Sequence, residues 1–127
     1  MPKFIWLLCI GLAGGAGALA RYGLAKFVQD STKGLFPWGT FTVNVAGCLV
    51  FGLLFVVMTD RFNVNPHVRA VVLVGFMGAF TTFSTFAFET GEFLRDGQWL
   101  LAVGNVAGQN LFGLAALFAG LSLGKLF

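Results

Sequence analysis

The side chains best placed to do chemistry in this chain are neutral amides inside long apolar runs. Asn44 falls within one uncharged stretch, and Asn105, Gln109 and Asn110 fall within another. Amide N–H groups can replace water around a small anion, and amides also hydrogen-bond one membrane helix to another. These positions therefore indicate either a polar ion path or interhelical hydrogen bonding.

A run of glycine, phenylalanine and hydroxyl residues, Gly75 to Phe86, fills a third uncharged stretch. Its glycines and the pair Thr81-Thr82 weaken a helix, and backbone freed by a break must line protein or water. Freed carbonyls can hold Na⁺, as broken helices do in transporters. The hydroxyls of Ser84 and Thr85 can form a polar track. We therefore predict that this span is a helix broken near its middle.

Three phenylalanines of the same run, Phe80, Phe83 and Phe86, recur every three residues. Spacing alone favours an aromatic packing stripe on one side of a helix. An aromatic ring is also negative on its face and positive at its edge, so edges pointed inward would solvate a small anion without a full charge. Both interpretations stay open from the residues alone.

Reactive groups are few. No nucleophile–base pair and no metal-ligand cluster appears in the sequence, so we do not expect an enzyme. His67, the only histidine, follows Pro66 near a predicted membrane boundary. Cys9 and Cys48 lie in apolar runs and are interpreted as small hydrophobic residues, although a disulfide between them stays open. The net charge of +3 is too small to indicate a nucleic-acid partner.

The composition makes lipid the expected solvent for this chain. Of its 127 residues, 57% are hydrophobic and 10% are charged, against a quarter charged in ordinary soluble domains. The charged residues separate four apolar runs, each long enough to cross a hydrocarbon core of about 30 Å as a helix. We predict an all-α membrane protein, a single transmembrane domain over residues 1–127, with spans at about 4–28, 36–59, 68–94 and 98–124.

The first span is unusually rich in small residues. Gly11 and Gly15 have the spacing of a GxxxG contact, which lets two membrane helices approach closely. The segment ending at Ala20 also loosely matches a secretory signal peptide. Its glycines make a poor apolar core for such a peptide, so a packed transmembrane helix is the favoured interpretation.

The basic residues divide evenly between the two sides of the membrane. Four spans place Lys3, Arg61, Arg69 and Lys125 on one side, and Arg21, Lys26, Lys33 and Arg95 on the other. The positive-inside rule therefore selects no orientation. Either other details fix one orientation, or chains insert both ways and pair antiparallel as a dual-topology homodimer.

Several of these motifs together resemble the CrcB/Fluc family of fluoride channels. The resemblance is carried by Phe83-Ser84-Thr85-Phe86 at the end of Gly75–Phe86, by Gly39–Asn44 and by Arg21-Tyr22, and it covers essentially the whole chain. It implies a fluoride-selective channel in the bacterial inner membrane, where passive export of cytoplasmic fluoride confers fluoride resistance. It also implies an antiparallel homodimer with two pores, whose partners are the fluoride ion, Na⁺ and the bilayer.

The resemblance also implies roles for individual residues. The ring edges of Phe83 and Phe86 line the pore with Asn44, the hydroxyl track of Ser84 and Thr85 follows, and the backbone carbonyls of Gly78 and Thr81 hold a structural Na⁺ at the dimer centre. Glu89 matches an acidic residue near the pore end, and Arg21 matches an arginine at the end of the first helix. The fourth span departs from the family, because some relatives place Tyr and Ser along the pore where this chain has Asn105, Gln109 and Asn110.

Three rival functions use the same overall architecture. A dual-topology exporter of small cations needs a carboxylate embedded in the membrane, and a fluoride/proton antiporter needs a similar coupling group. No carboxylate lies in the middle of a predicted span, which counts against both. A purely structural membrane subunit would have no use for a polar break in its third span.

Overall fold

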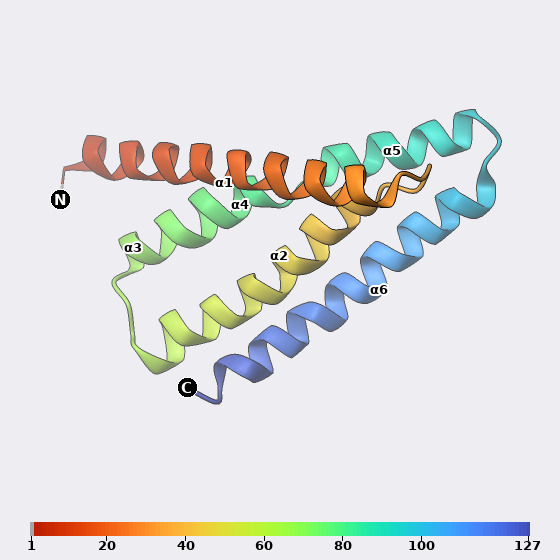
Figure 1. Ribbon diagram of the computed structural model, residues 1–127. Coiled ribbons are helices and arrows are strands. Elements are labelled where there is room, and N and C mark those ends of the chain that lie inside the picture. The colour runs from red at the N-terminus through yellow and green to blue at the C-terminus, as the bar shows by residue number, and fades with distance from the viewer. Residues whose placement is uncertain (1) are drawn as a thin grey trace.

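The computed structural model describes residues 2–127, and helices account for nearly all of them (Figure 1). The elements are α1 (Lys3–Thr32), α2 (Trp38–Val56), η1 (Val57–Arg61), α3 (Pro66–Ala70), η2 (Val71–Met77), α4 (Gly78–Phe80), α5 (Phe83–Arg95) and α6 (Trp99–Gly124). Four helical units are long and apolar enough to cross a membrane: Lys3–Thr32, Trp38–Arg61, Pro66–Arg95 and Trp99–Gly124. The prediction of four spans in an all-α protein is confirmed, and no β-strand occurs in the described part of the chain.

Helix α1 continues to Thr32, past the predicted end of its span at residue 28. Its polar last turns are held by local bonds: Lys26 pairs with Asp30 at 3.1 Å, and the Ser31 hydroxyl donates to a backbone carbonyl one turn earlier. The helix stops at Lys33, whose φ of 49° and ψ of 35° are left-handed. Such hydrogen bonds extend a helix beyond its apolar run, which hydrophobicity alone cannot predict.

The helices approach one another through glycines. A Cβ added at Gly17 of α1 would collide with the Phe76 carbonyl of η2, and one added at Gly120 of α6 would collide with the Leu49 carbonyl of α2. Gly11 and Gly15 have no such neighbour within 4 Å in this chain. The close contact of α1 with the third span therefore uses Gly17, and the predicted GxxxG pair is free on the outside of the chain.

Helices α2 and α6 run side by side along their lengths, and α1 lies across η2 and α4 (Figure 1). The described residues at both chain ends lie at the same end of the bundle, whereas the α5–α6 turn lies at the opposite end. Few large side chains are fully buried, and most apolar ones face outward. This inverted pattern suits a chain that is surrounded by lipid or by a second copy.

Candidate functional site

The third span changes conformation between α4 and α5. Helix α4 ends at Phe80, and α5 begins at Phe83. The two residues between them are extended, with φ and ψ of −87° and 158° at Thr81 and of −146° and 122° at Thr82. Two extended residues expose backbone N–H and C=O groups that a helix would satisfy internally, so the surroundings must supply their partners.

Asn44 of α2 supplies both partners for one of these residues. The Thr82 N–H donates to Asn44 Oδ1 at 2.8 Å, and Asn44 Nδ2 donates to the Thr82 carbonyl at 3.0 Å. In a continuous helix the same N–H would donate to the carbonyl four residues earlier, at Gly78. The Asn44 amide thus takes the place of a peptide group, and the Gly78 carbonyl loses its regular helical donor.

A second carbonyl is freed in the same way by the cap of α5. The Thr85 N–H donates to Thr82 Oγ1 at 3.2 Å, and the two hydroxyl oxygens of these residues lie 3.0 Å apart. Thr82 is therefore the N-cap of α5, as Thr often is. The Thr85 N–H would otherwise bond to the Thr81 carbonyl, so this cap deprives the Thr81 carbonyl of its helical donor.

The amides of the second and fourth spans form one connected chain. Asn44 Nδ2 donates to Gln109 Oε1 at 2.7 Å, and Gln109 Nε2 donates to Asn105 Oδ1 at 3.0 Å. Asn105 Nδ2 donates in turn to Thr90 Oγ1 at 2.9 Å. Asn105 is fully buried, and its bond to Thr90 joins α6 to α5. The chain thus links α2, α6 and α5 beside the extended residues.

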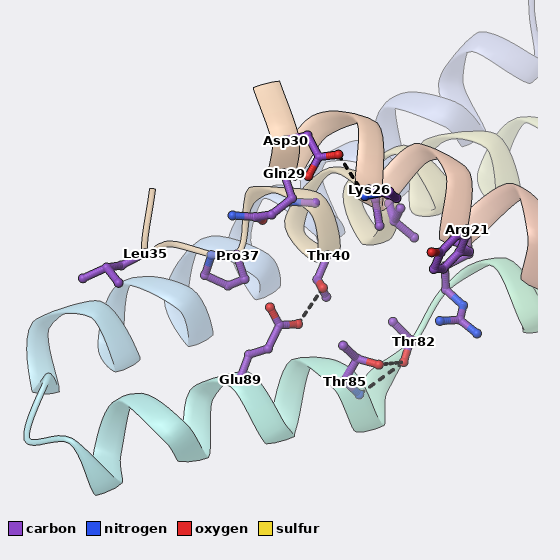
Figure 2. Close-up of a pocket in the computed structure, with 14 residues that line it drawn as sticks. Arg21, Lys26, Gln29, Asp30, Leu35, Pro37, Thr40, Thr82, Thr85 and Glu89 are labelled. Atoms are coloured by element: carbon purple, nitrogen blue, oxygen red, sulfur yellow. Dashed lines mark hydrogen bonds and ion pairs between the residues drawn. The ribbon is translucent and has the colours of Figure 1, made fainter. Parts of the chain in front are cut away.

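A cavity of about 500 Å³, here called the charged cavity, opens beside the first helix. Figure 2 shows its polar lining: Arg21, Lys26, Gln29, Asp30, Thr40, Thr82, Thr85 and Glu89. Thr40 donates to Glu89 Oε1 at 2.5 Å, and Arg21 Nε donates to the Ala79 carbonyl at 3.1 Å. Arg21 therefore lines the charged cavity and also binds the backbone just before the extended residues.

A second cavity, of about 250 Å³, is here called the aromatic cavity. Its lining includes Asn44, Cys48, Thr81, Thr82, Phe83, Phe86, Gln109 and Asn110. The rings of Phe83 and Phe86 are 5.6 Å apart at 60°, an edge-to-face arrangement. Thr82 lines both cavities. The extended residues of the third span therefore lie between the two spaces.

The remaining predicted site residues lie in less central places. Ser84 is exposed and lines neither cavity, unlike its neighbour Thr85. Asn110 lines the aromatic cavity but donates to the Val106 carbonyl of its own helix at 2.7 Å. Cys9 and Cys48 are free thiols, which settles the open question of a disulfide between them.

Two residues of this site, Thr82 and Thr90, are missing from the sequence-based candidates. Thr82 had a signal, because Thr is a favoured N-cap residue and Thr82 directly precedes α5. Thr90 had none: its role depends on the packing of α5 against α6, which brings it to the amide of Asn105. Its hydroxyl donates to the Phe86 carbonyl at 2.9 Å and so remains free to accept.

The chain was compared with models of known protein families. The family described as "CrcB-like protein, Camphor Resistance (CrcB)" matches residues 8–121. The chain belongs to this family. The CrcB match includes most of all four spans, the extended residues and the lining of both cavities.

Curated members of the CrcB family are similar to this chain over nearly its whole length. A protein of Nitratidesulfovibrio vulgaris is 52% identical over 94% of this chain and 97% of its own length. A protein of Nitrosococcus oceani is 47% identical over 98% of this chain and 97% of its own length. Both carry the name "Fluoride-specific ion channel FluC". Together with the four apolar helices, the CrcB relationship identifies a multi-pass bacterial membrane protein.

Proposed function

We propose that this protein is a fluoride-selective channel that exports cytoplasmic fluoride passively and so confers fluoride resistance. The observation that carries the proposal is the name of its relatives, fluoride-specific ion channels that are about half identical over almost the entire chain. The geometry supports it independently. Hydroxyls line the charged cavity, side-chain amides and the rings of Phe83 and Phe86 line the aromatic cavity, and Thr82 is shared by both.

The direction of transport follows from the acid–base chemistry of fluoride. Fluoride enters acidified cells as neutral HF, which dissociates at the higher internal pH and leaves the anion trapped. A negative membrane interior then drives the anion out through any selective path, without ATP or a proton carrier. The protein need only replace the water around a small, strongly hydrated ion.

The proposed path of the anion runs from the charged cavity to the aromatic cavity. Arg21 at the wall of the charged cavity attracts an anion, and the hydroxyls of Thr82 and Thr85 carry it past the extended residues. The ring edges of Phe83 and Phe86 then receive it in the aromatic cavity. The two rings lie within 5.6 Å of each other, so both can contact one small ion in this cavity.

A second copy, inverted in the membrane, completes this path in the proposed assembly. Phe83 is 78% exposed in the single chain although it lines the aromatic cavity. Gly78, at the start of α4, is exposed as well. The even division of basic residues allows insertion in both orientations. An antiparallel homodimer would cover these surfaces and form two equivalent pores.

The proposed structural Na⁺ fits the oxygen donors at the break in the third span. The carbonyls of Gly78 and Thr81 have both lost their helical N–H donors, to Asn44 and to the Thr82 cap. Neutral carbonyl oxygens are the ligands that half-helix ends offer to Na⁺ in transporters. Each chain supplies two such oxygens, and an inverted pair would supply four. A bound Na⁺ would neutralise these dipoles and join the two copies.

Dual topology predicts that a C-terminal label is reached from both sides of the membrane. A cysteine appended after Phe127, in a Cys9→Ser/Cys48→Ser background, should be modified partly by an impermeant thiol reagent in intact spheroplasts and completely after lysis. The balanced charges give this result because neither orientation is favoured. Complete labelling, or none, from the outside alone would leave one orientation and remove the antiparallel dimer.

Growth tests the proposed function in cells. A bacterial strain lacking its own fluoride exporter, supplied with this protein, should grow at fluoride concentrations that stop the same strain carrying an empty vector. Passive export lowers internal fluoride, so growth should improve most in acidic medium, where more HF enters. Equal inhibition of both strains, with the protein present in the membrane fraction, would reject fluoride export.

A further inference from the structure

The geometry points to different roles for two amides. Asn44 is a positioning residue that keeps Thr82 extended between α4 and α5. Gln109 presents the amide N–H that the anion meets. The inference deepens the proposed function and rests on it for the identity of the anion. It assigns different roles to two side chains that both line the aromatic cavity.

The hydrogen bonds of Asn44 use both of its donor hydrogens. One hydrogen of Nδ2 goes to the Thr82 carbonyl at 3.0 Å and the other goes to Gln109 Oε1 at 2.7 Å. Its oxygen accepts the Thr82 N–H at 2.8 Å. A side-chain amide has two donor hydrogens. An anion could bind this nitrogen only by displacing a bond that holds the break.

Gln109, which lines the same cavity, has one amide hydrogen that is not used in the amide chain. Its Nε2 donates one hydrogen to Asn105 Oδ1 at 3.0 Å. The second has no acceptor among the described residues 2–127, and the side chain lines the cavity that holds Phe83 and Phe86. An N–H in this position adds a hydrogen-bond donor to the positive ring edges, which is what a dehydrated anion requires.

The neighbours of Gln109 fix the direction of that N–H. Its oxygen accepts from Asn44 Nδ2. If the Gln109 amide were turned over, its nitrogen would face the Asn44 nitrogen and its oxygen would face the Asn105 oxygen, and both hydrogen bonds would be lost. Asn105 is held in turn by its bond to Thr90, whose hydroxyl donates to the Phe86 carbonyl. The amide chain thus runs in one direction from the break to the helix that carries Phe86. A donor held this way needs little reorganisation when an ion arrives.

The two roles predict different consequences of removing each amide. Without Asn44, the Thr82 N–H can return to the Gly78 carbonyl, which withdraws an oxygen from the proposed Na⁺ site. Without the Gln109 amide, the break keeps both of its Asn44 bonds to Thr82. Loss of Na⁺ stabilisation should therefore follow the Asn44 change alone, whereas loss of fluoride flux should follow both.

The test compares Asn44→Leu with Gln109→Met, which is close in size and has no N–H. Each purified protein is melted in detergent with NaCl or with N-methylglucamine chloride, and its fluoride efflux from liposomes is measured. Wild type and Gln109→Met should show the same Na⁺-dependent rise in Tm, and Gln109→Met should lose flux about tenfold or more. Asn44→Leu should lose both the Na⁺-dependent rise and the flux.

A second variant covers the case in which Asn44→Leu does not fold. Asn44→Asp keeps an oxygen for the Thr82 N–H but loses the donors to the Thr82 carbonyl and to Gln109. Because the Thr82 N–H is still kept from the Gly78 carbonyl, this variant should retain the Na⁺-dependent rise and lose flux. The inference is overturned if Asn44→Leu keeps the rise, if Gln109→Met loses it or keeps full flux, or if wild type has none. Wild type without fluoride flux would instead reject the proposed function, while the melting comparison would still test the role of Asn44.

Discussion

Replacing Phe86 by Ile is expected to lower fluoride flux about tenfold or more, equivalent to about 1.4 kcal/mol or more on the transport barrier, and replacing Phe83 by Ile should act similarly. Isoleucine is apolar and bulky but has no positive ring edge. The two rings meet edge to face in the aromatic cavity. If their edges solvate the ion, the loss appears in flux rather than in assembly.

The matched control for the ring variants is Phe88→Ile. Phe88 lies on the same helix, is 67% exposed and lines neither cavity. All three variants should elute from a sizing column as wild type does, and Phe88→Ile should keep flux within about twofold of wild type, as substitutions on an open surface usually do. Full flux in both Phe83→Ile and Phe86→Ile would mean that the two rings serve only in packing.

A Gly47→Val substitution is expected to abolish most fluoride flux by displacing the extended residues of the third span, although Gly47 itself lines neither cavity. Gly47 is buried on α2, and a Cβ there would collide with the Thr81 methyl and lie 3.3 Å from the Phe80 ring. Thr81 cannot simply rotate away, because its hydroxyl donates to the Met77 carbonyl at 3.2 Å. Overpacking of this kind costs about 1–3 kcal/mol, and here it falls on the extended residues.

Gly104→Val provides the comparison for this effect. A Cβ at Gly104 has nothing within 4 Å in the chain, so the same increase in volume meets no backbone or ring. Fluoride efflux and Tm should both fall for Gly47→Val and stay near wild type for Gly104→Val. If Gly47→Val conducts normally, the close approach of α2 to Thr81 is not needed for transport.

The spans were predictable because membrane insertion is governed by composition and by the spacing of charges. Uncharged runs ending at Arg21, Asp60, Glu89 and Lys125 were enough to count four helices. The end of α1 was not predictable in this way, since its last turns are polar and depend on local bonds such as Lys26–Asp30.

The amide residues could be chosen from the sequence, but their partners could not. Polar groups at membrane depth are costly, which singles out Asn44, Asn105 and Gln109. Which of them meet depends on the rotation of α6 against α2, and that rotation is set by close contacts such as Gly120 with the Leu49 carbonyl. That both donor hydrogens of Asn44 are used in hydrogen bonds could be established only once Thr82 and Gln109 were placed beside it.

The most direct test of a fluoride-selective channel is ion efflux from liposomes containing the purified protein. Liposomes loaded with KF or KCl are diluted into salt of an impermeant anion, valinomycin is added, and ion-selective electrodes follow release. Rapid fluoride release with almost no chloride release, and no requirement for a pH gradient, is the predicted result. Equal release of the two anions, or fluoride release that depends on a proton gradient, would contradict a selective passive channel.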